Sequence, residues 1–143
     1  MAKWKPLNDR DRFQQGVRDV EKKLNKEISK IRITSRKGLV KAGYHIAGIS
    51  AARAPLYVGN RRQGGSLRGS VRVRKNHLEG EIASESNTNS LTDVVVVFEE
   101  KYAATQHEHV EFDHKEGEAK FLEKTVVEEQ DRVLRIIGGV DNA

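Results

Sequence analysis

The chain has 143 residues, of which 36% are hydrophobic and 33% are charged. A chain of this size can bury one core, so we expect a single domain over residues 1–143 with a thin core or one that a neighbouring subunit completes. It contains no cysteine, which excludes disulfides, thiolate nucleophiles and cysteine-bound zinc. No apolar run approaches the roughly 18–20 residues of a membrane span, and the first residues lack a hydrophobic signal core. We therefore expect synthesis in the cytoplasm and no membrane partner.

The charge is divided unevenly along the chain. Residues 1–75 contain 20 Lys and Arg against 5 Asp and Glu, a net charge of +15. Residues 76–143 contain 6 Lys and Arg against 16 Asp and Glu, a net charge of −10. Such asymmetry suits nucleic-acid contact, a ring whose basic face meets the acidic face of the next subunit, or two solvated helices of opposite charge.

The first expected element is a long amphipathic helix over residues 8–33. Its apolar residues recur at spacings of 4, 3, 4, 4 and 3, which places them on one stripe: Phe13, Val17, Val20, Leu24, Ile28 and Ile31. Asn8 or Asp9 can cap its start, and its other faces are rich in Lys and Arg.

A break at Thr34-Ser35 predicts a second helix, which begins near residue 36 and ends at Pro55. Its inner positions include three small residues at helical spacing, Gly43, Ala47 and Ser50. Because glycine is a poor helix former, we expect another element to approach closely there.

The period then changes from helical to alternating. Residues 67–74 alternate apolar residues with arginines and predict a half-buried strand, and residues 78–82 predict a return strand after a turn at residues 75–77. A mobile polar loop is expected at residues 84–90. The apolar run at residues 94–98 predicts a central strand buried on both faces.

The last expected element is a helix that begins near Phe121 and ends at Gly138-Gly139. Four apolar residues can share one of its faces: Leu122, Val126, Val133 and Ile137. The fold class is therefore α+β, an antiparallel sheet of a hairpin plus a central strand, packed by a long N-terminal helix, a second helix and a C-terminal helix.

The segment YAATQHEHVEF, residues 102–112, raises the question of a metal site. On a strand, His107 and His109 would point the same way and could reach one metal with His114 or Asp113. The helical HExxH spacing is absent, and clustered histidines beside acidic residues are usually solvated. We therefore expect a surface or interface role, with no metal and no cofactor.

Signals for catalysis are missing from the sequence. Ser50, Ser66 and Ser70 lack the G-x-S-x-G context of an activated serine. GNRRQGG is not followed by the G-K-[ST] of a phosphate-binding loop. We expect no enzyme activity.

Residues 53–75 form a basic stretch without an acidic residue: Arg53, Arg61, Arg62, Arg68, Arg72, Arg74 and Lys75. These side chains suit contact with a phosphate backbone or docking on an acidic partner. Tyr57 is the one aromatic residue there, which gives little support for base stacking. A sequence-independent nucleic-acid-binding module that uses Arg61, Arg62, Arg72 and Arg74 is therefore one hypothesis for the function.

Several short motifs occur in a characteristic order. A helix ends at Ala54-Pro55, a loop follows with Gly59 and Gly65, and Leu67-Arg68-Gly69-Ser70 opens the hairpin. After the apolar strand come, in order, Tyr102-Ala103, Gln106-His107-Glu108, Glu111-Phe112 and Phe121-Leu122.

In these motifs, over residues 36–137, the chain resembles the small head–tail joining or tail-completion proteins of tailed phages, often labelled minor capsid or tail-component proteins. Asp113-His114 departs from the pattern, because the family often has Gly-Thr there. The long basic N-terminal helix is also more prominent than in that pattern.

The resemblance implies a structural role in the virion neck. Such proteins form rings, typically hexamers, between the head connector and the tail, and double-stranded DNA passes through the lumen. The implied neighbours are a connector or stopper protein and a tail-tube or terminator protein. Loops at residues 56–66 and 84–91 would extend toward adjacent rings or the lumen.

Two sets of candidate contact residues follow from the resemblance. Candidates for contact with DNA or an adjacent ring are Arg61, Arg62, Arg68, Arg72 and Arg74. Candidates for the subunit interface are Tyr102 and Phe112 as anchors, with Glu108 and Glu111 facing basic residues of a neighbour. Whether the chain is an adaptor, stopper, completion or terminator protein stays open at this point.

Overall fold

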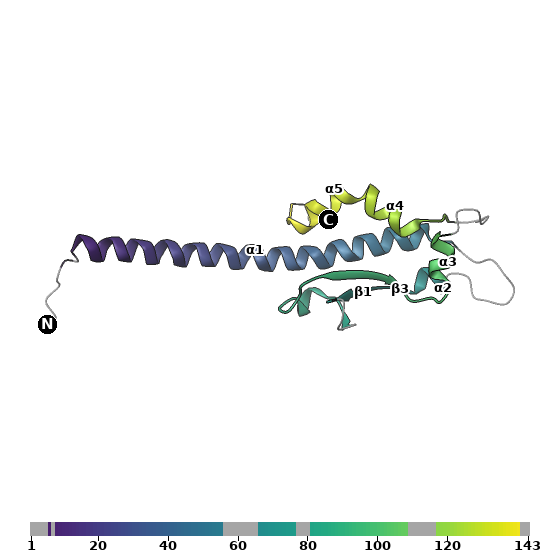
Figure 1. Cartoon of the computed structure of the whole chain (residues 1–143), viewed down its shortest axis with the longest axis horizontal. Helices are drawn as coiled ribbons and strands as arrows, with labels where there is room; N and C mark the ends of the chain where they lie inside the picture. Colours follow the sequence, from purple (N-terminus) through teal and green to yellow (C-terminus); the bar gives the residue numbers. More distant parts are fainter. Residues whose placement is uncertain (1–5, 7, 56–65, 77–80, 109–116, 141–143) are drawn as a thin grey trace. The chain divides into compact units, whose positions relative to one another are not determined.

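The computed structural model describes residues 6, 8–55, 66–76, 81–108 and 117–140. The chain divides into two compact units, Met1–Ile33 and Thr34–Ala143. The elements follow one another as a long helix, a short helical turn, a small sheet and the C-terminal helices (Figure 1). This mixture of helices with an antiparallel sheet confirms the expected α+β class.

Helix α1 runs without interruption over Asp9–Arg53, 45 residues. Its start is capped as predicted, because the Asn8 side-chain oxygen accepts a hydrogen bond from the Asp11 N–H at 2.8 Å. The predicted break at Thr34-Ser35 was wrong. Serine and threonine can compete with helical hydrogen bonds, but unlike proline they leave the backbone donor in place, and the helix continues through them.

In the unit Met1–Ile33, the described part of α1 exposes its apolar stripe. The six side chains predicted for one face keep between 46% and 74% of their surface exposed: Phe13, Val17, Val20, Leu24, Ile28 and Ile31. We call this set the apolar stripe. Large contiguous apolar surfaces of this kind commonly mark an interaction site.

The unit Thr34–Ala143 contains the sheet. Strands β1 (Val71–Lys75), β2 (Glu81–Ile82) and β3 (Val94–Phe98) pair antiparallel in the order β2-β1-β3. The predicted hairpin is confirmed, and Asn76 takes a positive φ of 52° directly after β1. Strand β1 starts later than predicted, because residues 66–69 form the helical turn α2 (Ser66–Gly69).

The prediction of a central strand buried on both faces was wrong both in its position in the sheet and in its burial. Residues 94–98 do form a strand, but β3 lies at one end of the described sheet and β1 is in the middle. All five β3 residues are half-buried. An apolar run shows that a segment needs burial, but its position in the sheet depends on which strand pairs with β1.

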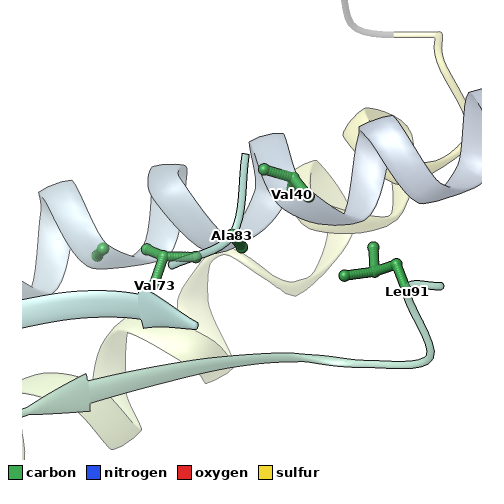
Figure 2. Close-up of a cluster of buried hydrophobic side chains, with 5 residues drawn as sticks. Val40, Val73, Ala83 and Leu91 are labelled. Atoms are coloured by element: carbon green, nitrogen blue, oxygen red, sulfur yellow. The ribbon is translucent and has the colours of Figure 1, made fainter. Parts of the chain in front are cut away.

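One face of this sheet packs against the second half of α1. A β-carbon on Gly43 would lie 2.6 Å from Val94 Cγ1 and 2.9 Å from Val73 Cγ1, so the glycine permits the predicted close approach. The buried cluster between these elements contains Val40, Ala47, Val73, Ala83 and Leu91 (Figure 2). Ala83 and Leu91 come from the loops on either side of a 3-10 turn, η1 (Glu85–Asn87).

The loop expected to be mobile at residues 84–90 is folded around this turn. Asn87 accepts a hydrogen bond from the Ser84 N–H at 2.8 Å and donates one to the Ile82 carbonyl at 3.0 Å. Thr88 is buried. Short polar side chains that form local hydrogen bonds have therefore produced a defined turn.

The described residues of the C-terminal part form three helices, α3 (Ala103–Glu108), α4 (Phe121–Glu128) and α5 (Gln130–Ile137). The single helix predicted from Phe121 is interrupted at Glu129, whose carboxylate lies 2.7 Å from His45 Nε2 of α1. Gly138 ends α5 as expected. In the part of the chain that the structure describes, no helix is long and apolar enough to cross a membrane.

Candidate functional site

Residues of the separated sequence motifs meet in one buried cluster. It consists of Ala54, Leu67, Ala103 and Phe121, with Phe98, Tyr102 and Leu122 packed against it. We call this set the motif cluster. The Phe98 and Phe121 rings meet edge to face with centroids 5.0 Å apart. The end of α1, the turn α2, the start of α3 and the start of α4 are thus held together by the residues that define the motifs.

Arg68 connects the turn α2 to the end of α1 through a hydrogen bond. Its Nε donates a hydrogen bond to the carbonyl of Ala54 at 2.7 Å, and Ala54 is fully buried. Ser70 donates its hydroxyl to the Leu67 carbonyl at 2.7 Å. The L-R-x-S motif therefore closes a turn and satisfies a buried carbonyl at the end of a helix.

Gly117 is a structural residue that the sequence pattern did not single out. It has a φ of +91°, and a β-carbon there would lie 2.6 Å from Pro55 Cα. The next residue, Glu118, donates its N–H to the Arg53 carbonyl at 2.9 Å. A glycine shortly before Phe121-Leu122 was the available signal, but only the fold shows that it faces Pro55.

His107 serves as an N-terminal cap for α4. Its Nε2 accepts a hydrogen bond from the Glu123 N–H at 3.3 Å, while its Nδ1 lies 2.8 Å from Glu108 Oε1. The residue at the cap position itself, Lys120, makes no side-chain capping bond. Because Nε2 accepts in the contact with Glu123, Nδ1 is the ring nitrogen that donates toward Glu108. The ring also meets Phe121 edge to face at 5.1 Å.

These contacts give His107 a structural role. It lies on helix α3 and not on a strand, so the geometry considered for a shared metal does not apply. Among the described residues, no group of three metal-binding side chains is gathered. His109, Asp113 and His114 lie outside the described residues.

Glu108 is paired within its own chain. Its carboxylate bonds to the Lys120 ammonium as well as to His107. The hydrogen bond from Lys120, followed by that from His107, lowers the pKa of Glu108 below its usual value. The same bond raises the pKa of Lys120. The other interface candidates are Tyr102, which is half-buried within the motif cluster, and Glu111 and Phe112, which lie outside the described residues.

The candidate arginines are also engaged within the chain where the structure describes them. Arg72 and Arg74 alternate with the inward-facing valines of β1, and both form ion pairs with Glu99 just beyond β3. Arg72 Nη1 also donates to the carbonyls of Gly69 and Val71, each at 2.8 Å. Arg61 and Arg62 lie outside the described residues.

An apolar groove of about 350 Å³ lies between α1, β3 and the C-terminal helices. Its lining includes Leu39, Ile46, Val94, Leu122, Val126 and Val133. Three of the four residues predicted to share one helical face therefore do line a common surface. Val126 is 50% exposed.

Comparisons of the chain with family models, with curated proteins and with solved structures each found no match.

Proposed function

We propose that this protein is a structural subunit of a tailed-phage neck. In this proposal it forms a homo-oligomeric ring, a hexamer, that joins the head connector to the tail and lets double-stranded DNA pass through its lumen. The ring would form from subunits made in the host bacterial cytoplasm and would then be part of the virion. The role is structural and not catalytic.

The motif cluster is the observation that carries this proposal. The resemblance depends on short motifs at residues 54–55, 67–70, 102–108 and 121–122, each of which is weak alone. Their packing into one buried cluster supports the interpretation that they belong to a single structural signature.

The exposed apolar surfaces give independent support for assembly. The apolar stripe and the groove beside β3 both leave apolar area uncovered in the single chain. A subunit that neighbours complete needs such surfaces, whereas a monomer rarely tolerates them.

The proposal is tested by assembly and by function in the virion. Electron microscopy and native mass spectrometry of the full chain should show a closed ring, alone or after addition of connector or tail particles. An early stop codon in the gene of a phage that encodes the protein should leave filled heads and finished tails unjoined, and purified protein should restore joining. A strict monomer that never associates with heads or tails, together with normal virions from the mutant phage, would overturn the proposal.

A further inference from the structure

We propose that residues 9–33 of α1 pair with the same segment of a second copy of the chain, parallel and in register, through the apolar stripe. This inference deepens the proposed function, on which it rests for the setting of the contact, because it names the segment through which two subunits associate. The contact itself is a property of this chain and can be tested without any phage component.

The first observation is that the stripe is an uncovered helix face. Phe13 exposes 74% of its surface and Ile31 64%, and the four residues between them expose 46–57%. Tertiary packing of an amphipathic face supplies most of the stability of a helix in a protein. Within the described residues of this unit, a single helix is present and nothing packs on that face. Within the described residues of this unit the face has no partner, and we assign that place to a second copy of the chain.

The spacing of the stripe identifies an identical helix as that partner. The spacings 4, 3 and 4 lead from Phe13 to Leu24, and the series then begins again with 4 and 3 to Ile31. This is an 11-residue repeat, about 3.67 residues per turn, which keeps the apolar face on one side of a helix with only a slight right-handed drift. A second copy has a face of the same length and the same drift, so the two faces can match from end to end.

Charges beside the stripe favour a parallel arrangement. At about 98° per residue, Arg32 lies about 65° to one side of the stripe centre and Glu27 about 65° to the other. In a parallel, in-register pair, Arg32 of each copy faces Glu27 of the other, which gives two complementary contacts of the kind that flank coiled-coil seams. Glu27 already binds Lys30 at 2.9 Å, but its side chain remains 61% exposed and can accept a further donor.

The antiparallel arrangement is disfavoured by the same charges. Full overlap of two antiparallel stripes brings Glu21 of one copy beside Glu21 of the other, and Arg10 beside Arg32. Like charges directly across a helix pair are destabilising. Parallel pairing places the two-fold axis of the pair along the helices, whereas antiparallel pairing places it across them.

The area available suits an interface that is weak by itself. Burial of the exposed half of six such side chains on two copies removes on the order of 600 Å² of apolar surface. The stems of flanking Lys and Arg side chains add to this area. The total approaches the roughly 1,000 Å² expected of a specific interface. We therefore expect weak association of free subunits that is reinforced when several contacts form together.

Cysteine cross-linking tests the arrangement directly, because the chain has no cysteine of its own. Under mild oxidation of the full chain, Phe13→Cys and Leu24→Cys should each form a covalent homodimer, since both positions lie at the centre of the stripe and face their own copy in register. Lys26→Cys, on the opposite face of the same helix, is the matched control and should cross-link much more slowly.

Other arrangements give different cross-links. A mixture of Phe13→Cys and Ile31→Cys that links while Phe13→Cys alone does not would show antiparallel pairing and overturn the proposal. Preferential linking of Leu24→Cys to Val126→Cys would show that the stripe docks in the groove of another copy, which would also overturn it.

A charge placed in the stripe provides a second measurement. Leu24→Glu should weaken self-association in sedimentation equilibrium by roughly tenfold or more, because it forces a carboxylate into the apolar seam. Ser29→Glu adds the same charge on an outer face and should leave association unchanged. Equal association of both variants, or absence of association of the unmodified chain at every concentration, would overturn the inference.

The outcomes separate this inference from the proposed function. If Leu24→Glu still forms rings and joins heads to tails, the stripe contact is wrong and the neck function stands. If the stripe cross-links as expected but loss of the gene leaves virions intact, the neck function is wrong and the contact stands.

Discussion

Gly38 of α1 lies directly against the end of α5, where a β-carbon on this residue would come within 2.6 Å of the Ile136 carbonyl oxygen. The Ile137 carbonyl oxygen would be equally close. These neighbours are backbone atoms, so they cannot move aside as a flexible side chain can. The contact between α1 and α5 therefore depends on the absence of a side chain at position 38.

Replacement of this glycine should destabilise the protein. We expect Gly38→Ala to lower the free energy of unfolding by about 1–3 kcal/mol, because the added methyl group forces the helices apart. Gly48→Ala on the same helix is the matched control, since its β-carbon meets nothing within 4 Å, and better helix propensity should stabilise it by up to about 1 kcal/mol. Urea unfolding followed by circular dichroism measures both. Equal effects of the two substitutions would show that α5 does not pack where the structure has it.

The capping role of His107 predicts a graded effect of two substitutions. His107→Phe keeps an aromatic ring against Phe121 but removes the acceptor for the Glu123 N–H, and it should cost about 1 kcal/mol. His107→Ala removes the ring contact as well and should cost more. Thr105→Ala, at an exposed position on the same helix, is the control, and thermal unfolding is the measurement. A neutral effect of His107→Phe would mean that the cap contributes nothing.

The pairing of Glu108 with Lys120 predicts a pH-dependent contribution to stability. The lowered pKa of Glu108 means that its contribution is fully present above the usual value of 4.5 and is lost as the pH falls through the lower, folded-state pKa. The difference in melting temperature between the unmodified chain and Glu108→Gln should therefore be largest near neutral pH and disappear in acid.

The effect should also shrink in high salt, because the ion pair lies at the surface, where added ions screen it. Glu85→Gln, at an exposed position in η1, is the control for the loss of one surface carboxylate. A Glu108→Gln difference that persists unchanged into acid would contradict the ion pair.

The ion pairs of Glu99 predict how the arginines respond to DNA. Because Glu99 binds both Arg72 and Arg74, we expect weak duplex binding by the unmodified chain at physiological salt. Glu99→Gln should raise the affinity for duplex DNA. It should also steepen the fall of log affinity with log salt concentration by about one, which corresponds to one additional phosphate contact. Filter binding across a salt series measures both quantities, with Glu100→Gln as the neighbouring control. If Glu99→Gln and Glu100→Gln bind alike, these arginines do not face DNA.

The local pattern of residues predicted most elements of this fold. Alternation of valine with arginine predicted the strand that became β1, Asn8 and Pro55 predicted the ends of the long helical region, and Gly43 predicted a close approach. The first two depend on neighbours a few residues away, through caps or the period of side chains along one element, and the third depends on the absence of a side chain at one position. Such information is present in the sequence itself.

Only the tertiary structure decided how the elements combine. It placed β1 and not β3 in the middle of the sheet, continued α1 through Thr34-Ser35, and interrupted the last helix at Glu129 opposite His45. It also placed His107, which the sequence offered as a possible metal ligand, as an N-terminal cap of α4. These outcomes depend on contacts between segments that are far apart in the sequence, and the free energy of such contacts has no signature in either segment alone.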